Sequence, residues 1–204
     1  MRRIRTRTFS EEEKEEIKLK MKEIGLPMLK EQGLIHMSIS KLAEAAGIGK
    51  STFYSFYSSK EEFIEDMLAD HRRRLLDNLQ KGLKGREKYS VEESKEIIRK
   101  MVQDADHVYQ NFSREDELAL KKMYEKKGIP FLDLEKEKQV IDFLVSMMEG
   151  VREHLDYAVI ANMMKVIVFS YEQKDMLHPS GFEQTISMMV ESLVDLIFQN
   201  KEEG

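Results

Sequence analysis

Residues 33–57 read GLIHMSISKLAEAAGIGKSTFYSFY, and this stretch decides the fold. Gly33 is placed to end one helix, and Ser38 is placed to cap the next. Apolar residues then recur at i, i+3 and i+4, which predicts a short helix over 39–46 with one buried face. A glycine-containing turn follows, and a second short helix is expected over 50–56. Two such helices around a sharp turn are typical of a helix-turn-helix, whose second helix enters the major groove of DNA.

The second short helix has a composition that suits DNA. Its small polar residues can contact bases and phosphates, its lysine adds positive charge, and its tyrosine can reach a phosphate or a thymine methyl group. The run Gly49-Lys50-Ser51-Thr52 also resembles the end of a phosphate-binding loop. That loop needs a glycine where this chain has Glu44, and it follows a strand rather than a helix, so DNA binding is the favoured interpretation.

Charge is divided unevenly along the 204 residues. Residues 1–60 carry 12 Lys and Arg against 8 Asp and Glu, a net charge of +4, whereas residues 61–204 carry 21 against 30, a net charge of −9. This division indicates that the first part of the chain meets a polyanion. The chain has no cysteine, its five histidines are scattered, and no catalytic motif is recognisable. We therefore expect no enzyme activity, no cofactor and no metal site.

The start of the chain and its most apolar stretch bear on location. The first residues are basic but lack the apolar core of a secretory signal. The stretch from Tyr157 to Tyr171 is too short to span a bilayer. We expect a soluble cytoplasmic protein without a membrane partner.

Helix signals run through the whole sequence, and strand signals are nearly absent, which predicts an all-α fold of about nine helices. Serines followed three residues later by glutamate mark four helix starts, at Ser10, Ser59, Ser90 and Ser180. The helices are expected at 10–32, 39–46, 50–56, 60–82, 90–111, 114–127, 132–153, 156–175 and 180–200. The polar, glycine-containing break after residue 82 is the best candidate for a boundary between parts of the chain.

Residues 10–70 resemble the DNA-binding domain of the TetR (tetracycline-repressor-like) family of transcriptional regulators. The family pattern appears as Leu42-Ala43 followed by the ungapped run AGIGKSTFYSFYSSKEEF over 46–63. Tyr57 replaces the usual phenylalanine and Ser58 the usual proline. Pro27, with Gly25 close by, departs from the family's first helix and predicts a bend or break there.

The resemblance implies an N-terminal three-helix domain over 10–70, with the motif at 38–57, and a C-terminal ligand-binding and dimerisation bundle over 71–204. Lys60 is implied to clamp the DNA backbone. The basic N-terminus is interpreted either as an arm that reaches the DNA or as a solubilising tail. The expected DNA contacts are Arg3, Arg5, Ser38, Ser40, Gly49, Lys50, Ser51, Thr52, Tyr54, Ser55, Tyr57 and Lys60.

The acidic body holds most of the 14 methionines. Methionine fills irregular cores, and it also lines cavities that accept varied apolar shapes, so the residues alone leave both interpretations open. The family resemblance implies a small-molecule pocket between the central helices, with an apolar or amphipathic effector. The candidate lining residues are Met101, Tyr109, Phe112, Met123, Phe143, Met147 and Met163.

The last two long helices are expected to pair with their symmetry mates, as they do in the resembled family. An apolar stripe at helical spacing supplies the candidate interface: Phe182, Ile186, Met189, Val190, Leu193, Leu196 and Ile197. The sequence thus predicts a homodimeric regulator, most simply a ligand-responsive repressor of a palindromic DNA operator. The alternative is a helical dimeric scaffold that uses its helix-turn-helix for protein contacts.

Overall fold

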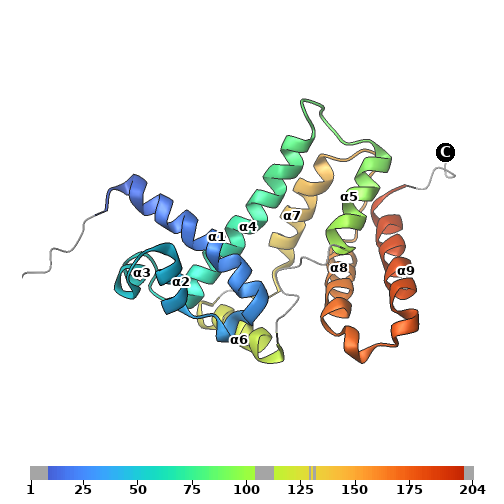
Figure 1. Ribbon diagram of the computed structural model, residues 1–204. Helices are drawn as coiled ribbons and strands as arrows, with labels where there is room; N and C mark the ends of the chain where they lie inside the picture. Colours follow the sequence, from blue (N-terminus) through green and yellow to red (C-terminus); the bar gives the residue numbers. More distant parts are fainter. Residues whose placement is uncertain (1–8, 104–112, 129, 131, 200–204) are drawn as a thin grey trace, which may run out of the picture.

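The computed structural model describes residues 9–103, 113–128, 130 and 132–199, and within them the fold is all α-helical (Figure 1). The helices are α1 (Glu11–His36), α2 (Ile39–Ala46), α3 (Lys50–Phe56), α4 (Lys60–Gly82), α5 (Val91–Gln103), α6 (Arg114–Lys126), α7 (Leu134–Ser146), α8 (Tyr157–Glu172) and α9 (Pro179–Ile197), with a 3₁₀ turn η1 (Lys174–Met176). The expected all-α class is confirmed. The last part of the helix expected over 90–111 lies outside the described residues.

Three of the four serine-led helix starts have the expected hydrogen bonds. Ser10 and Glu13 form a reciprocal capping box, and so do the backbone and side chains of Ser90 and Glu93. The Ser59 side chain accepts from the first turn of α4. The start expected at Ser180 is wrong, because α9 begins at Pro179, whose fixed φ favours the first helical position.

The backbone of α1 stays helical through Pro27, so the break that was one of the two outcomes expected near Gly25 and Pro27 is absent. Pro27 is exposed, and water can therefore reach the Glu23 carbonyl that lacks its usual donor. The backbone breaks instead at Gly33, with φ 71° and ψ 177°, a conformation that strongly favours glycine. The sequence expectation that α1 stops at Gly33 is thus met by this break, beyond which one more turn continues to residue 36.

α7 ends at Ser146 rather than near 153. Beyond it the backbone pairs with other parts of the chain: Tyr89 donates its N–H to the Met147 carbonyl at 2.8 Å, and Glu149 donates to the Tyr89 carbonyl at 3.1 Å. Gly150 then takes a positive φ of 73°. These long-range bonds end the helix. Among the described residues no helix, the apolar α8 included, is long and apolar enough to cross a membrane.

The buried side chains gather in two large clusters. One joins α1, α2, α3 and the start of α4, and it also takes in Leu120 and Met123 of α6. The other joins α5, α7, α8 and α9. Figure 1 shows the same grouping, with α6 beside the N-terminal helices and α8 and α9 at the opposite side of the molecule. Although α6 follows α5 in the sequence, it packs against α1 and contributes to the N-terminal cluster.

Candidate nucleic-acid interface

The turn between α2 and α3 is built from glycine geometry and backbone hydrogen bonds. Ser38 caps α2 by accepting from the Lys41 N–H at 3.4 Å. Gly47 ends α2 with φ 80°, and Ile48 donates its N–H to the Ala43 carbonyl at 2.9 Å. A side chain would strain this left-handed position, which is why glycine follows two alanines here. The turn fixes how α3 crosses α2.

α3 has one buried side and one exposed side. Phe53 is fully buried, and its ring centroid lies 5.5 Å from that of Phe63 in an edge-to-face pair. Tyr54 on the same helix is 45% exposed. The other predicted contacts Ser40, Gly49, Lys50, Ser51 and Ser55 are exposed as well, and Ser38 and Thr52 are half-buried. The Ser55 hydroxyl donates to the Thr52 carbonyl at 2.6 Å.

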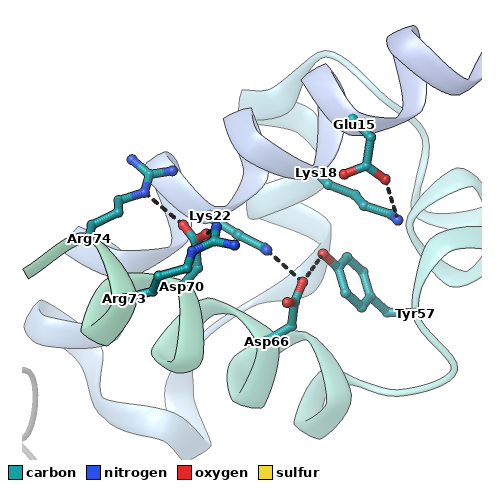
Figure 2. A network of polar contacts seen from close by, with 8 residues as sticks. All are labelled: Glu15, Lys18, Lys22, Tyr57, Asp66, Asp70, Arg73 and Arg74. Atoms are coloured by element: carbon teal, nitrogen blue, oxygen red, sulfur yellow. Dashed lines mark hydrogen bonds and ion pairs between the residues drawn. The ribbon is translucent and has the colours of Figure 1, made fainter. Parts of the chain in front are cut away.

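Among the predicted contacts that lie within the described residues, Tyr57 alone is buried. Its side chain is only 4% exposed, and its hydroxyl donates to Asp66 Oδ2 at 2.8 Å. Lys22 of α1 also reaches Asp66 Oδ2, at 2.8 Å, so three elements meet at one carboxylate (Figure 2). Tyr57 is therefore a core residue that joins the end of α3 to α4 and α1.

Burial and this network shift two pKa values. Burial, followed by the hydrogen bond to Asp66, raises the pKa of the Tyr57 hydroxyl. Burial alone would raise the pKa of Asp66, but the hydrogen bonds from Lys22 and Tyr57 together lower it below its ordinary value. Asp66 is therefore held ionised between its two donors. A second carboxylate further along α4, Asp70, accepts from Arg73 and from Arg74, whose bond is 2.8 Å long (Figure 2).

Lys60 stands at the first position of α4, directly after α3. It is half-buried, and its Nζ donates to the Ile35 carbonyl at 2.9 Å. Burial lowers the pKa of this lysine. The residue implied to clamp the DNA backbone is thus engaged with the end of α1 in the free protein.

Arg3 and Arg5 lie outside the described residues. The described chain begins at Phe9, whose ring centroid lies 6.2 Å from that of Phe56 at the end of α3. The first described residue therefore lies beside the end of α3.

The candidate pocket residues do not converge on one site. Met123 belongs to the N-terminal cluster, Met101 and Met163 pack against the second cluster, and Met147 lies in a third, small cluster with Leu83 and Tyr89. Tyr109 and Phe112 lie outside the described residues. Phe143 is exposed and lines an open groove of about 290 Å³ beside Ala69, Arg72, Arg73, Leu76 and Asp77 of α4. Within the part of the chain that the structure describes, the candidate lining residues are therefore divided among three clusters and one groove.

The expected interface stripe on α9 is mostly core of the single chain. Five of its members are 2% exposed or less and pack in the second cluster: Phe182, Ile186, Val190, Leu193 and Ile197. Met189 is half-buried and Leu196 is 37% exposed. A stripe at helical spacing reports burial but does not say against what, and here the chain's own α5 and α8 cover it. The apolar side chains left exposed on α8 and α9 are instead Val159, Val166, Phe169, Met188 and Leu196.

Two carboxylates with structural roles at the site were missed in the sequence. No sequence motif marks Asp66. The only indication is Tyr57, which stands where the family usually has phenylalanine and whose hydroxyl needs a hydrogen-bond partner. Asp116 is almost fully buried and accepts from the Ile35 N–H at 2.6 Å. A signal existed there, because Ser113 and Asp116 form a capping box of the serine-x-x-acid type.

Residues 26–67 match the family of bacterial regulatory proteins described as tetR family. Solved structures share the fold over nearly the whole chain. A TetR-family transcriptional regulator from Rhodococcus sp. has a TM-score of 0.60 and 13% identity, covering 90% of this chain and 99% of its own. The fatty acid degradation regulator FadR from Bacillus halodurans has a TM-score of 0.52 and 16% identity, covering 93% and 97%. A TetR-family regulator from Cytophaga hutchinsonii has the same TM-score and identity, covering 96% and 100%. Among curated proteins none matches this sequence.

Proposed function

We propose that this chain, whose residues 26–67 match the tetR family of bacterial regulatory proteins, is a transcriptional regulator that binds a palindromic DNA operator as a homodimer and represses transcription. Each protomer would insert α3 into the major groove, with the two α3 helices about one turn of DNA apart. The protein would act in the cytoplasm, where bacterial DNA lies.

The observation that carries the proposal is the two-sided build of α3. Its buried side rests on Phe53 and Tyr57, while Lys50, Ser51 and Tyr54 stand exposed on the other side. A seven-residue helix has little stability of its own, so this packing is what would keep the exposed side chains in a fixed register for base and phosphate contacts. The net charge of +4 over residues 1–60, against −9 for the rest, supports a DNA surface at this end.

We assign the dimer contact to the exposed apolar side chains of α8 and α9 rather than to the buried stripe. Val166 and Phe169 of α8 are 48% and 51% exposed, and Met188 of α9 is 65% exposed. Large apolar side chains exposed on two neighbouring helices favour a partner that removes them from water. A second copy of this chain is the occupant that recognition of a palindrome requires, because it supplies the second α3.

We propose that the DNA-binding unit consists of residues 10–70 together with α6, and that the rest of 71–204 forms the dimerisation body. Leu120 and Met123 support the inclusion of α6, because both are buried in the same cluster as α1–α4. The expected boundary near residue 70 is kept on α4, whose buried side chains in the N-terminal cluster end at Leu68.

For the effector we propose an apolar or amphipathic small molecule that binds in the groove between α4 and α7. Phe143 and Leu76 give this groove apolar walls, and Arg72 places a positive charge at its edge. α4 carries both a wall of the groove and part of the N-terminal core. A ligand that favours one placement of α4 over another would change DNA affinity by population shift, and the DNA would change ligand affinity by the same factor.

The test is selection of bound duplexes from a random DNA pool, followed by fluorescence anisotropy with a selected duplex over a range of salt. We expect a palindromic consensus and a strong loss of affinity as salt rises. Lys50→Ala should reduce the salt slope by about one unit, whereas the matched control Lys100→Ala, an exposed lysine of α5, should leave it unchanged. No enriched sequence, together with no salt-dependent binding, would favour the scaffold alternative.

A further inference from the structure

The peptide groups of Ile35 are held from two sides by side chains of two other helices. Its N–H donates to Oδ1 of Asp116 in α6 at 2.6 Å, and its carbonyl accepts from Nζ of Lys60 in α4 at 2.9 Å. The break at Gly33 explains why partners are needed, because the non-helical backbone there interrupts the ladder that would otherwise serve the following N–H groups. Ile35 is thus a fixed point between α1, α4 and α6.

Asp116 is built into this place. It is 1% exposed, and its Oδ2 accepts from the Ser113 N–H at 2.8 Å and from the Ser113 hydroxyl at 2.9 Å. Both carboxylate oxygens therefore have donors, which a buried carboxylate requires. Any side chain at position 33 would collide with the Asp116 carboxylate, so the glycine makes room for it. These bonds outweigh burial and lower the pKa of Asp116.

The fixed point lies at the base of the helix-turn-helix. Residues 36–59 contain α2 and α3, and the bond between Ile35 and Lys60 closes this segment at both ends. Ser38, which caps α2, follows three residues after Ile35. A shift of the Ile35 peptide would therefore move the entry to α2 and the exit from α3 together.

The rest of α6 is attached along the same unit. Leu120 and Met123 are buried in the N-terminal cluster, and Lys127, just beyond the helix, pairs with Glu65 of α4. α6 thus has apolar contacts in its middle, an ion pair at its end and the Asp116 carboxylate at its start. Of these three attachments, the Asp116 carboxylate is the one that binds the backbone of Ile35, shortly before α2 begins.

We propose that Asp116 is a positioning residue for DNA recognition, which sets the α2–α3 pair by holding the Ile35 peptide from α6. This inference rests on the proposed DNA-binding function. Asp116 belongs to α6, and its carboxylate accepts from Ile35 and Ser113 rather than from α3. Its loss should weaken DNA binding without removing any phosphate contact.

The test compares Asp116→Ala, Asp116→Asn and Ser113→Ala with the wild type, using a duplex selected by the wild-type protein. Asp116→Ala should bind about tenfold more weakly at a temperature where it is fully folded, with an unchanged salt slope and faster exchange of the Ile35 amide hydrogen. Asp116→Asn keeps an oxygen acceptor at the same place and should stay within about threefold of wild type. Ser113→Ala removes the α6 cap but not the bond to Ile35, so it should lower stability and leave DNA affinity within about threefold.

The proposal is overturned if Asp116→Ala, folded and with a fast-exchanging Ile35 amide, binds DNA like the wild type. It is also overturned if Ser113→Ala weakens binding as much as Asp116→Ala, because the effect would then be a general one of α6. Should Asp116→Ala not fold, Asp116→Glu replaces it, since its longer side chain cannot occupy the same space beside Gly33. If the wild type selects no DNA, the proposed function fails first. Hydrogen exchange of the backbone amides of residues 38–57 then tests the positioning role by itself. Faster exchange in Asp116→Ala than in the wild type would support it, and unchanged exchange would contradict it.

Discussion

Tyr54 and Tyr57 show how differently two tyrosines three positions apart can be used. Tyr54 is 45% exposed on α3, whereas Tyr57 is 4% exposed and bonded to Asp66. Tyr54 is accessible to a binding partner. Tyr57 holds the C-terminal end of α3, the helix that carries Tyr54. Substitutions at the two positions should therefore separate DNA affinity from stability.

Tyr54→Ala should weaken DNA binding and leave the fold intact. We expect a loss of about 1–3 kcal/mol per half-site, since one surface contact to a base or phosphate is removed. Anisotropy with a selected duplex at fixed salt measures the affinity, and thermal unfolding serves as the control for stability. Wild-type affinity in this variant would remove Tyr54 from the interface.

Tyr57→Phe should lower the free energy of unfolding by about 1 kcal/mol, because Asp66 loses one of its two donors. The effect should also depend on pH. The folded pKa of Asp66 lies below its unfolded value, so its contribution is present above the unfolded pKa and is lost as pH falls through the folded pKa.

Urea titrations of both proteins at several pH values between about 3 and 7 measure this difference. It should be largest near neutral pH and shrink in acid. Tyr54→Phe is the matched control, because it removes a hydroxyl from the exposed face of the same helix. An equal, pH-independent loss in both variants would contradict the role given to Asp66.

α1 illustrates how packing between helices overrides local preference. Pro27 breaks no helix because the lost backbone bond faces water, and Gly25 is retained because α4 comes close. A Cβ at position 25 would lie 2.9 Å from both Met67 Sδ and Phe63 Cζ. Gly25 and Pro27 both disfavour helix, yet their replacement by alanine should change the free energy of unfolding in opposite directions.

Pro27→Ala should raise the free energy of unfolding by about 1–2 kcal/mol, because it restores a donor to the Glu23 carbonyl in an exposed helix interior. The gain is smaller than the intrinsic propensity difference, since proline also restricts the unfolded chain. Gly25→Ala should instead destabilise by about 1–3 kcal/mol through overpacking against α4. Chemical denaturation of both variants decides this, and a stabilising Gly25→Ala would contradict the close approach.

At the far end of the molecule from α3, the exposed faces of α8 and α9 bear on assembly. Val166→Glu and Phe169→Glu each place a charge where a second copy is proposed to bury an apolar group. Both variants should be folded monomers at micromolar concentration, whereas the wild type should be a dimer. Sedimentation velocity measures the state and circular dichroism the helix content.

Leu193→Glu is the contrasting variant, since Leu193 is fully buried within its own chain. It should lose helix content and aggregate rather than give a folded monomer. If Val166→Glu and Phe169→Glu both remain dimers like the wild type, the contact between copies lies elsewhere.

The groove between α4 and α7 makes the proposed effector testable. A lipophilic acid that binds there should raise the unfolding temperature, and a tenfold loss of DNA affinity must be matched by a tenfold loss of ligand affinity in the DNA complex, about 1.4 kcal/mol. Phe143→Ala and Arg72→Ala should weaken the ligand's effect, with Glu149→Ala as an exposed control outside the groove. An unchanged response in both groove variants would place the ligand elsewhere.

Local chemistry was sufficient for most of the helix starts and for the helix-turn-helix. Ser10, Ser38 and Ser59 cap helices through bonds to residues three positions on, and Gly47 takes the left-handed turn that its neighbours predict, so these features follow from residues adjacent in the chain. The prediction of which side of α3 is exposed was likewise correct, because burial of Phe53 leaves its neighbours on the helix facing outward.

What the sequence did not reveal are the contacts between residues far apart in the chain. Tyr57 is buried where it bonds to Asp66 of α4, which also pairs with Lys22 of α1. α6 is attached to the N-terminal unit by Asp116, which lies 81 positions from its partner Ile35. The apolar stripe of α9 was expected to be covered by a second copy, whereas five of its seven members are buried within the chain itself. Periodicity states that a face leaves water, and only the packing of all the helices together decides whether the chain itself or a second copy covers it.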